Sequence, residues 1–170
     1  EDWNKIILEV NKHKTMFKQK KAKMLRQLED IPKAAGILIA YSNSSTVAEH
    51  IIACSHQFGW PKRVFCSESR PMMEGLVMAR KLKSANIQTT IFTDAALMSR
   101  TGEADAVWVG GDCISEQGLV NKVGSKALAM LADRLDIPFI SLMTSDKILH
   151  PSMLPFFKFC RQNPRLHHLG

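Results

Sequence analysis

Apolar and polar residues recur with two different spacings along the 170 residues of this chain. Over residues 1–29 the apolar side chains return mostly at steps of three and four, which predicts an amphipathic helix. Pro32 ends that stretch. Further along, short runs of apolar residues alternate with segments that have helical spacing, and this change of spacing is typical of strands that alternate with helices.

The short apolar runs predict five strands, and the segments between them predict helices. A capping box, Thr46 with Glu49, is expected to begin the first of these helices, and Gly59 to end it. Strands separated by helices in this way are typical of βαβ units. We therefore expect an α/β fold, with a mostly parallel Rossmann-like sheet, helices on both faces and a preceding N-terminal helix. The expected strands are 36–41, 63–67, 89–92, 106–109 and 138–143, and the expected helices are 46–59, 72–83, a short one after Asp94, and 121–135.

The formal net charge of +7 is concentrated near the start of the chain. Seven basic residues and no acidic residue lie between positions 12 and 26: Lys12, Lys14, Lys18, Lys20, Lys21, Lys23 and Arg26. One interpretation is a surface that binds nucleic acid or another polyanion. The other, which we favour, is the solvated face of an amphipathic helix. Phe17 is the only aromatic residue among these lysines, so base stacking has little support.

The four cysteines, Cys54, Cys66, Cys113 and Cys160, form no C-x-x-C pair and have no histidine at zinc-finger spacing. We therefore expect no structural metal and no cofactor. Scattered thiols in apolar surroundings suit a reducing compartment, so we expect a cytoplasmic protein. No apolar run approaches the length that crosses a bilayer, and we expect no membrane partner.

Polar clusters follow four of the expected strands. In a parallel sheet the carboxyl ends of the strands lie at one edge, where ligands bind, so these clusters are expected to meet. The first cluster also begins a helix, and such a helix start favours anions such as phosphate. Asn121 and Lys122, which we expect to begin the next helix, would add an amide and a cation. The four clusters are Ser42 to Ser45, Glu68 to Arg70, Thr93 with Asp94, and Gly110 to Asp112.

Each of these residues also has an explanation that needs no ligand. Ser44, Ser45 and Thr46, or Asp94, would simply cap helices. Arg70 would pair with Glu68 or Glu74, Asp112 would belong to a turn, and Lys122 would be solvated. It is their convergence on one edge that favours a site for a polar ligand. No G-x-G-x-x-G, Walker A or G-x-S-x-G sequence occurs, so dinucleotide binding and a serine hydrolase have no support.

Five segments, in order, carry a resemblance to a known family. They are Ala40 to Val47, Glu68 to Pro71 with Glu74-Gly75, Thr93 to Ala96, Val109 to Asp112, and Gly118 to Gly124. Over residues 33–145 the chain resembles the C-terminal, Rossmann-like half of the family that joins the initiation factor 2B alpha, beta and delta subunits to the methylthioribose-1-phosphate isomerases. The resemblance implies residues 1–32 as the remnant of a helical domain, 33–145 as a ligand-binding domain, and 146–170 as a C-terminal extension related to dimerisation.

The isomerase branch implies roles for several residues. Asp112 lies at the position of the acid/base that moves a proton between the sugar carbons C1 and C2. Asn121 and Lys122 lie at the positions of a substrate-binding pair. Ser42 stands where that branch has a cysteine, and Glu74 where it has an amide. A serine hydroxyl is a far weaker proton donor than a tuned thiol, and it would need an adjacent base.

The segment Tyr41 to Val47 is more similar to the regulatory branch, in which the same edge binds a phosphorylated sugar or nucleotide. We therefore expect a non-catalytic regulatory protein that serves translation initiation, as a homodimer or in a hetero-oligomer with related subunits. An isomerase acting on a phosphorylated pentose is the alternative, and an RNA-binding module that uses the basic helix is a third. The expected ligand-binding residues are Ser42, Asn43, Ser44, Ser45, Arg70, Glu74, Asp94, Asn121 and Lys122.

Overall fold

The computed structural model describes residues 2–28 and 36–153, and within them it confirms the α/β fold. A long helix, α1 (Trp3–Gln27), precedes a sheet of five strands. These are β1 (Ile37–Tyr41), β2 (Arg63–Ser67), β3 (Gln88–Phe92), β4 (Ala106–Val109) and β7 (Phe139–Ser141). The helices between them are α2 (Ser45–Phe58), α3 (Gly75–Ser84), α4 (Asp94–Ser99) and α5 (Ser125–Arg134).

The strand order is β3-β2-β1-β4-β7, and every neighbouring pair is parallel. The chain builds outward from β1 through β2 to β3, then returns to place β4 on the other side of β1. The order therefore reverses between β1 and β4. In open α/β sheets the crevice at such a reversal point is where ligands bind.

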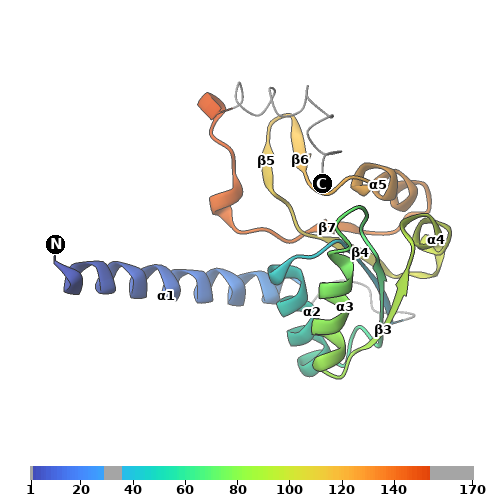
Figure 1. The fold of residues 1–170 in the computed structure, drawn as a ribbon, viewed down its shortest axis with the longest axis horizontal. Coiled ribbons are helices and arrows are strands. Elements are labelled where there is room, and N and C mark those ends of the chain that lie inside the picture. The colour runs from blue at the N-terminus through green and yellow to red at the C-terminus, as the bar shows by residue number, and fades with distance from the viewer. Residues whose placement is uncertain (1, 29–35, 154–170) are drawn as a thin grey trace.

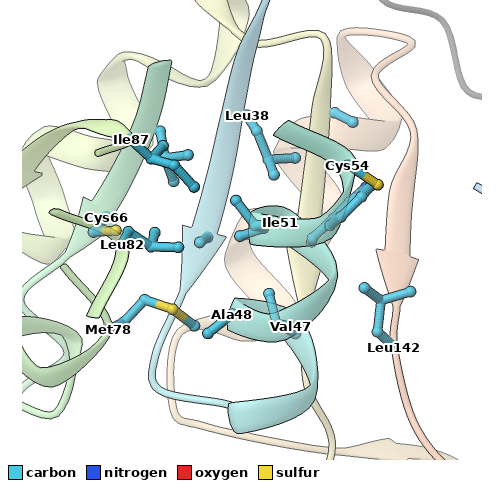
Figure 2. Close-up of a cluster of buried hydrophobic side chains, with 14 of the residues drawn as sticks. Leu38, Val47, Ala48, Ile51, Cys54, Cys66, Met78, Leu82, Ile87 and Leu142 are labelled. Atoms are coloured by element: carbon cyan, nitrogen blue, oxygen red, sulfur yellow. The ribbon is translucent and has the colours of Figure 1, made fainter. Parts of the chain in front are cut away.

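Alternate residues of the strands pack into two apolar clusters, one on each face of the sheet. Leu38 of β1 and Trp108 of β4 face a layer that contains α2 and α3, which Figure 2 shows around Ile51, Met78 and Leu82. Their neighbours on the strands belong to the opposite cluster, together with residues of α4 and α5 (Figure 1). Because both faces are buried there, the central strands β2, β1 and β4 have nearly continuous apolar sequences, whereas the edge strand β3 is half-exposed and more polar.

Helix α1 extends away from the sheet over most of its length (Figure 1). Residues 2–16 are all exposed, and only its last turns reach the body, where Met24, Leu25 and the buried Leu28 join the α2 side of the core. No helix in the described residues is both long and apolar enough to cross a membrane.

Several expected boundaries are wrong, for local reasons. Residue 44, not Thr46, caps α2, because the Ser44 Oγ accepts a hydrogen bond from the Val47 amide at 3.3 Å. Helix α3 begins at Gly75 rather than residue 72, since Met73 adopts a positive φ of 57° that a helix cannot include. Likewise α5 begins at Ser125 and not at Asn121, because Gly124 has a φ of 96°.

A short antiparallel hairpin, which the apolar pattern did not predict, lies between β4 and α5. Its strands are β5 (Cys113–Ser115) and β6 (Gly118–Val120). Asn121 and Lys122 therefore follow a strand rather than begin a helix. Most of the C-terminal extension, including Cys160, lies outside the described residues. Its relation to dimerisation and the domain boundaries stay predictions.

Candidate functional site

A polar cavity of about 430 Å³ opens at the carboxyl edge of the sheet, where the strand order reverses. The loops after β1 and β4 form two of its walls, and residues from the α3 start, from the segment after β6 and from the segment after β7 complete it. It is lined by Tyr41, Ser42, Asn43, Ser44, Ser45, Thr46, Glu74, Gly110, Gly111, Asp112, Asn121, Lys122 and Lys147.

The loop after β1 brings the N-terminus of α2 into this cavity. Ser44, Ser45 and Thr46 all line it, and they form the cap and the first turn of the helix. The first amides of a helix have no carbonyl partner within the helix, and they carry the positive end of its dipole. This wall of the cavity is therefore suited to an anion.

A glycine after β4 lets the two loops touch. A Cβ atom on Gly110 would lie 2.7 Å from the Cβ of Ser44, closer than side chains tolerate. Only a residue without a side chain allows the β4 loop to approach the α2 cap so closely. The glycines of the Gly110-Gly111-Asp112 segment thus serve packing of the cavity wall as well as the turn.

Ser42 adopts a left-handed backbone conformation, with a φ of 68°, directly after β1. Its amide donates to the Ser67 Oγ at 3.4 Å, and the Ser67 hydroxyl shares a hydrogen bond of 2.5 Å with that of Ser69. Both of these hydroxyls are fully buried. Within the described residues, no hydrogen bond joins the Ser42 hydroxyl to a carboxylate or an imidazole.

Lys122 and Glu74 form an ion pair inside the cavity, between residues 48 positions apart. The Lys122 Nζ lies 2.6 Å from the Glu74 Oε1, and the two side chains are only 13% and 26% exposed. The other carboxylate oxygen, Oε2, is buried and has no hydrogen-bond partner in the described part of the chain. The expectation that Lys122 might be solvated is therefore wrong.

Lys147 is a lining residue that the sequence did not point to. It belongs to the short 3-10 helix Ser145–Lys147, which follows β7. Its Nζ donates a hydrogen bond to the Gly111 carbonyl oxygen at 2.5 Å. The carboxyl-end rule, applied to the fifth strand as well as to the first four, would have suggested this segment. The five residues between β7 and Lys147 hid the connection, because the rule is usually applied to residues that follow a strand directly.

Asp112 and Asn121 lie on the hairpin side of the cavity. The Asp112 amide donates to the Val120 carbonyl at 2.8 Å, which starts the hairpin, while its side chain is exposed at the cavity. The Asn121 Nδ2 donates to the Ser125 Oγ at 3.0 Å, so its carbonyl oxygen is oriented by that contact. Both explanations of Asp112 therefore hold together: it belongs to a turn, and it faces the cavity.

Tyr41, the last residue of β1, lines the cavity and packs against the segment that precedes α5. Its hydroxyl donates to the Val123 carbonyl at 2.9 Å, and its ring occupies the space where Gly124 would carry a Cβ. Burial, and then the carboxylates of Asp94 and Glu74, raise the pKa of Tyr41 to about 12. The phenol is therefore a neutral hydrogen-bond donor at neutral pH.

Arg70 and Asp94, which we expected at the site, do not line the cavity. Arg70 is exposed and pairs with Glu68, its Nε 3.2 Å from the carboxylate. Asp94 does not cap α4, because Thr93 does so. Instead its carboxylate accepts from the amides of Ser69 and Arg70, each at 2.8 Å, and so holds the loop that leads to Glu74.

Among the described residues, no three His, Cys, Asp or Glu side chains are grouped closely enough to hold a metal ion. The cavity instead combines a helix N-terminus, hydroxyls, two side-chain amides, two ammonium groups and two carboxylates. Such a set can bind a phosphate at one end and hydroxyl groups at the other.

Comparison with known proteins places this chain in a family. Ribose 1,5-bisphosphate isomerase of Methanocaldococcus jannaschii is 32% identical over 123 residues, which are 72% of this chain and 39% of that protein. The crystal structure of the translation initiation factor eIF-2B of Pyrococcus horikoshii superposes with a TM-score of 0.69 at 34% identity, covering 79% of this chain and 47% of that one.

A more distant structure shares the fold alone. The tetrameric eIF2B-beta2-delta2 complex of Chaetomium thermophilum matches with a TM-score of 0.64 at 17% identity, over 86% of this chain and 49% of the matched one. The chain thus spans less than half the length of each of these three proteins. The model of the initiation factor 2 subunit family (IF-2B) matches residues 3–154, nearly the whole chain, and the chain therefore belongs to that family.

Proposed function

We propose that this chain is a non-catalytic regulatory protein that binds a phosphorylated sugar or nucleotide in the cavity at the carboxyl edge of its sheet. The observation that carries the proposal is Ser42: a hydroxyl without an adjacent base occupies the position that the isomerase branch gives to a cysteine. The N-terminus of α2 and Lys147 supply the charge that a phosphate needs, while Asn121 and Asp112 supply hydrogen-bond partners for hydroxyls.

Proton transfer between two sugar carbons needs a donor and an acceptor whose pKa values suit neutral pH. An isolated serine hydroxyl exchanges its proton poorly, and within the described residues no carboxylate or imidazole bonds to the hydroxyl of Ser42 to activate it. Binding does not require this chemistry. The remaining polar groups are therefore better matched to recognition than to turnover.

Isothermal titration with ribose 5-phosphate, AMP and inorganic phosphate tests the proposal. We expect saturable binding of at least one of the two organic phosphates, with tighter binding than inorganic phosphate. Ser44→Gly, which keeps the helix start but removes the hydroxyl, should weaken binding severalfold. No binding of any of the three at millimolar concentration would reject a ligand-binding role.

An isomerase that acts on a phosphorylated pentose is the second candidate, because Asp112 faces the cavity and a relative at 32% identity is named a ribose 1,5-bisphosphate isomerase. Here Asp112 would be the acid/base, Lys122 an anchor for the ligand, and Ser42 an orienting hydroxyl. An aldose-to-ketose assay on ribose 1,5-bisphosphate and methylthioribose 1-phosphate separates the candidates. Turnover that Asp112→Asn abolishes would favour the enzyme, and turnover that survives this change would exclude Asp112 from the mechanism.

The proposed assembly is an oligomer, either of this chain or with related subunits. Large apolar side chains are exposed on and beside the hairpin and α5, among them Val123, which is 79% exposed, and Met130, which is 64% exposed. We propose this exposed apolar surface as the contact site between subunits. Sedimentation analysis should find a dimer or larger species, and Met130→Glu should shift it toward the monomer; a monomer at all concentrations would contradict the proposal for self-association.

A further inference from the structure

We infer that Glu74 is a specificity-determining residue that limits the cavity to ligands carrying a single phosphate. This inference rests on the proposed ligand-binding function and goes beyond it by naming the ligand class. It follows from the charges that line the cavity and from the way in which two of them are paired.

Four charged side chains line the cavity, and their formal charges cancel. Glu74 and Asp112 are carboxylates, while Lys122 and Lys147 are ammonium groups. A cavity built for two phosphates would need an excess of positive charge, because each phosphate carries between one and two negative charges at neutral pH. The helix N-terminus of α2 adds only a partial charge.

The two lysines are not equivalent. Lys122 is 13% exposed and lies 2.6 Å from the Glu74 carboxylate, so its charge is already neutralised inside the protein. Lys147 donates to the carbonyl oxygen of Gly111, which is a neutral group, and its charge remains available to an anion. One uncompensated ammonium group beside one helix N-terminus matches one phosphate.

The carboxylates make the rest of the cavity unfavourable for a second anion. Asp112 is an exposed carboxylate at the cavity, and the single negative charge of Glu74 leaves its partner Lys122 with no net charge to offer a second anion. An anion brought near Asp112 would be repelled, whereas sugar hydroxyls could donate hydrogen bonds to it. The ligand that fits is therefore a polyhydroxylated group with one phosphate, rather than a bisphosphate.

Titration of wild type and Glu74→Gln with ribose 5-phosphate and with ribose 1,5-bisphosphate tests the inference. We expect wild type to bind the monophosphate at least as tightly as the bisphosphate. In Glu74→Gln the side chain keeps its size and loses its charge, which frees Lys122, so the bisphosphate should bind roughly tenfold more tightly than to wild type and the monophosphate should gain less.

Glu103→Gln is the matched control, because Glu103 also forms an ion pair, 3.0 Å from Arg100, but precedes β4 and so lies at the opposite edge of the sheet. It changes the net charge equally and should leave both affinities unchanged. An equal gain in Glu103→Gln would overturn the inference, as would an unchanged ligand preference in Glu74→Gln.

The wild-type measurement stands by itself if Glu74→Gln proves unstable by circular dichroism. Wild type that prefers the bisphosphate tenfold or more overturns the inference while leaving the ligand-binding function intact. Absence of binding for both sugar phosphates and for inorganic phosphate, in wild type and variant alike, overturns both together.

Discussion

At the scale of single residues, the cavity depends on a few close contacts between loops that are far apart in the sequence. Gly110 meets the α2 cap at Ser44, and Tyr41 fills the space beside Gly124 while it donates to Val123. These contacts hold the polar groups of different loops at fixed distances. Substitutions at such residues should therefore change stability and ligand binding together.

Tyr41 gives a direct readout of this packing, because it is the single tyrosine of the chain. Its pKa is raised from 10.0 to about 12, chiefly by burial. The folded protein therefore holds this proton more tightly than the unfolded chain does. The contribution of the protonated Tyr41 side chain to the free energy of unfolding is complete below pH 10 and is lost as the pH rises through about 12.

Absorbance titration near 295 nm should show a tyrosinate midpoint near pH 12 in native protein and near pH 10 in denaturant. In Tyr41→Phe, the stability difference from wild type should shrink between pH 9 and 12, because only wild type loses this contribution. A native midpoint at pH 10 would show that the ring is solvated.

Ser44 and Thr46 make a second test at this scale, since only Ser44 caps α2. Ser44→Ala should lower the free energy of unfolding by about 1 kcal/mol, because the Val47 amide loses its acceptor. Thr46→Ala should change it by less than about 0.5 kcal/mol. Urea denaturation measures both, and equal losses would support the capping box that the sequence suggested.

At the scale of elements, α1 differs from helices α2 to α5 because most of its apolar side chains are exposed to solvent. Trp3, Ile7 and Leu8 are each more than half exposed, whereas Leu28 at the other end is buried. Lys12, Lys14, Lys18, Lys23 and Arg26 are exposed and Lys20 is half-buried, which agrees with a solvated face and leaves a polyanion-binding role as a prediction. Steep weakening of RNA binding with salt would support that role.

The two ends of α1 should contribute very differently to stability. Leu28→Ala should destabilise the protein by about 2–3 kcal/mol, because it removes a buried side chain from the α2 side of the core. Ile7→Ala, at a site 56% exposed, should cost less than about 0.5 kcal/mol. Thermal or urea denaturation distinguishes them, and a large loss for Ile7→Ala would show that this face is covered in solution.

At the scale of the whole molecule, burial explains why the central strands are apolar, and it predicts that the buried thiols do not react. Cys66, in β2, is completely buried, and burial raises the pKa of its thiol to about 12. Cys54 and Cys113 are also buried, and neither forms a disulfide with a described residue. A thiol without thiolate character and without access to solvent does not react.

Alkylation with iodoacetamide at pH 7.5, followed by peptide mass spectrometry, should leave Cys66 unlabelled in native protein and label it fully in guanidinium. Cys54 and Cys113 serve as internal comparisons, and their labelling should likewise require unfolding. Rapid modification of Cys66 in native protein would mean that the sheet opens readily.

The amino-acid sequence by itself determined the parallel α/β fold, the first helix and the edge of the sheet at which the polar cavity opens. These follow from local patterns: apolar runs of strand length, helical spacing between them, and polar residues directly after the strands. The hairpin after Asp112 escaped prediction because its strands, of three residues each, are too short to show a period. The starts of α3 and α5 were misplaced because Met73 and Gly124 have a positive φ, and the start of α2 because Ser44 provides the cap; apolar spacing reveals neither.

Only the tertiary structure decided which of the polar residues at that edge share the cavity. The Asp94 carboxylate accepts hydrogen bonds from the amides of Ser69 and Arg70, and Glu74 forms an ion pair with Lys122. Lys147, which follows β7, lines the cavity. These partnerships join residues far apart in the chain, and they depend on the order of the strands and the course of each loop. The local sequence pattern indicates how a segment folds but not which segments become neighbours, so it does not predict the strand order or the course of the loops.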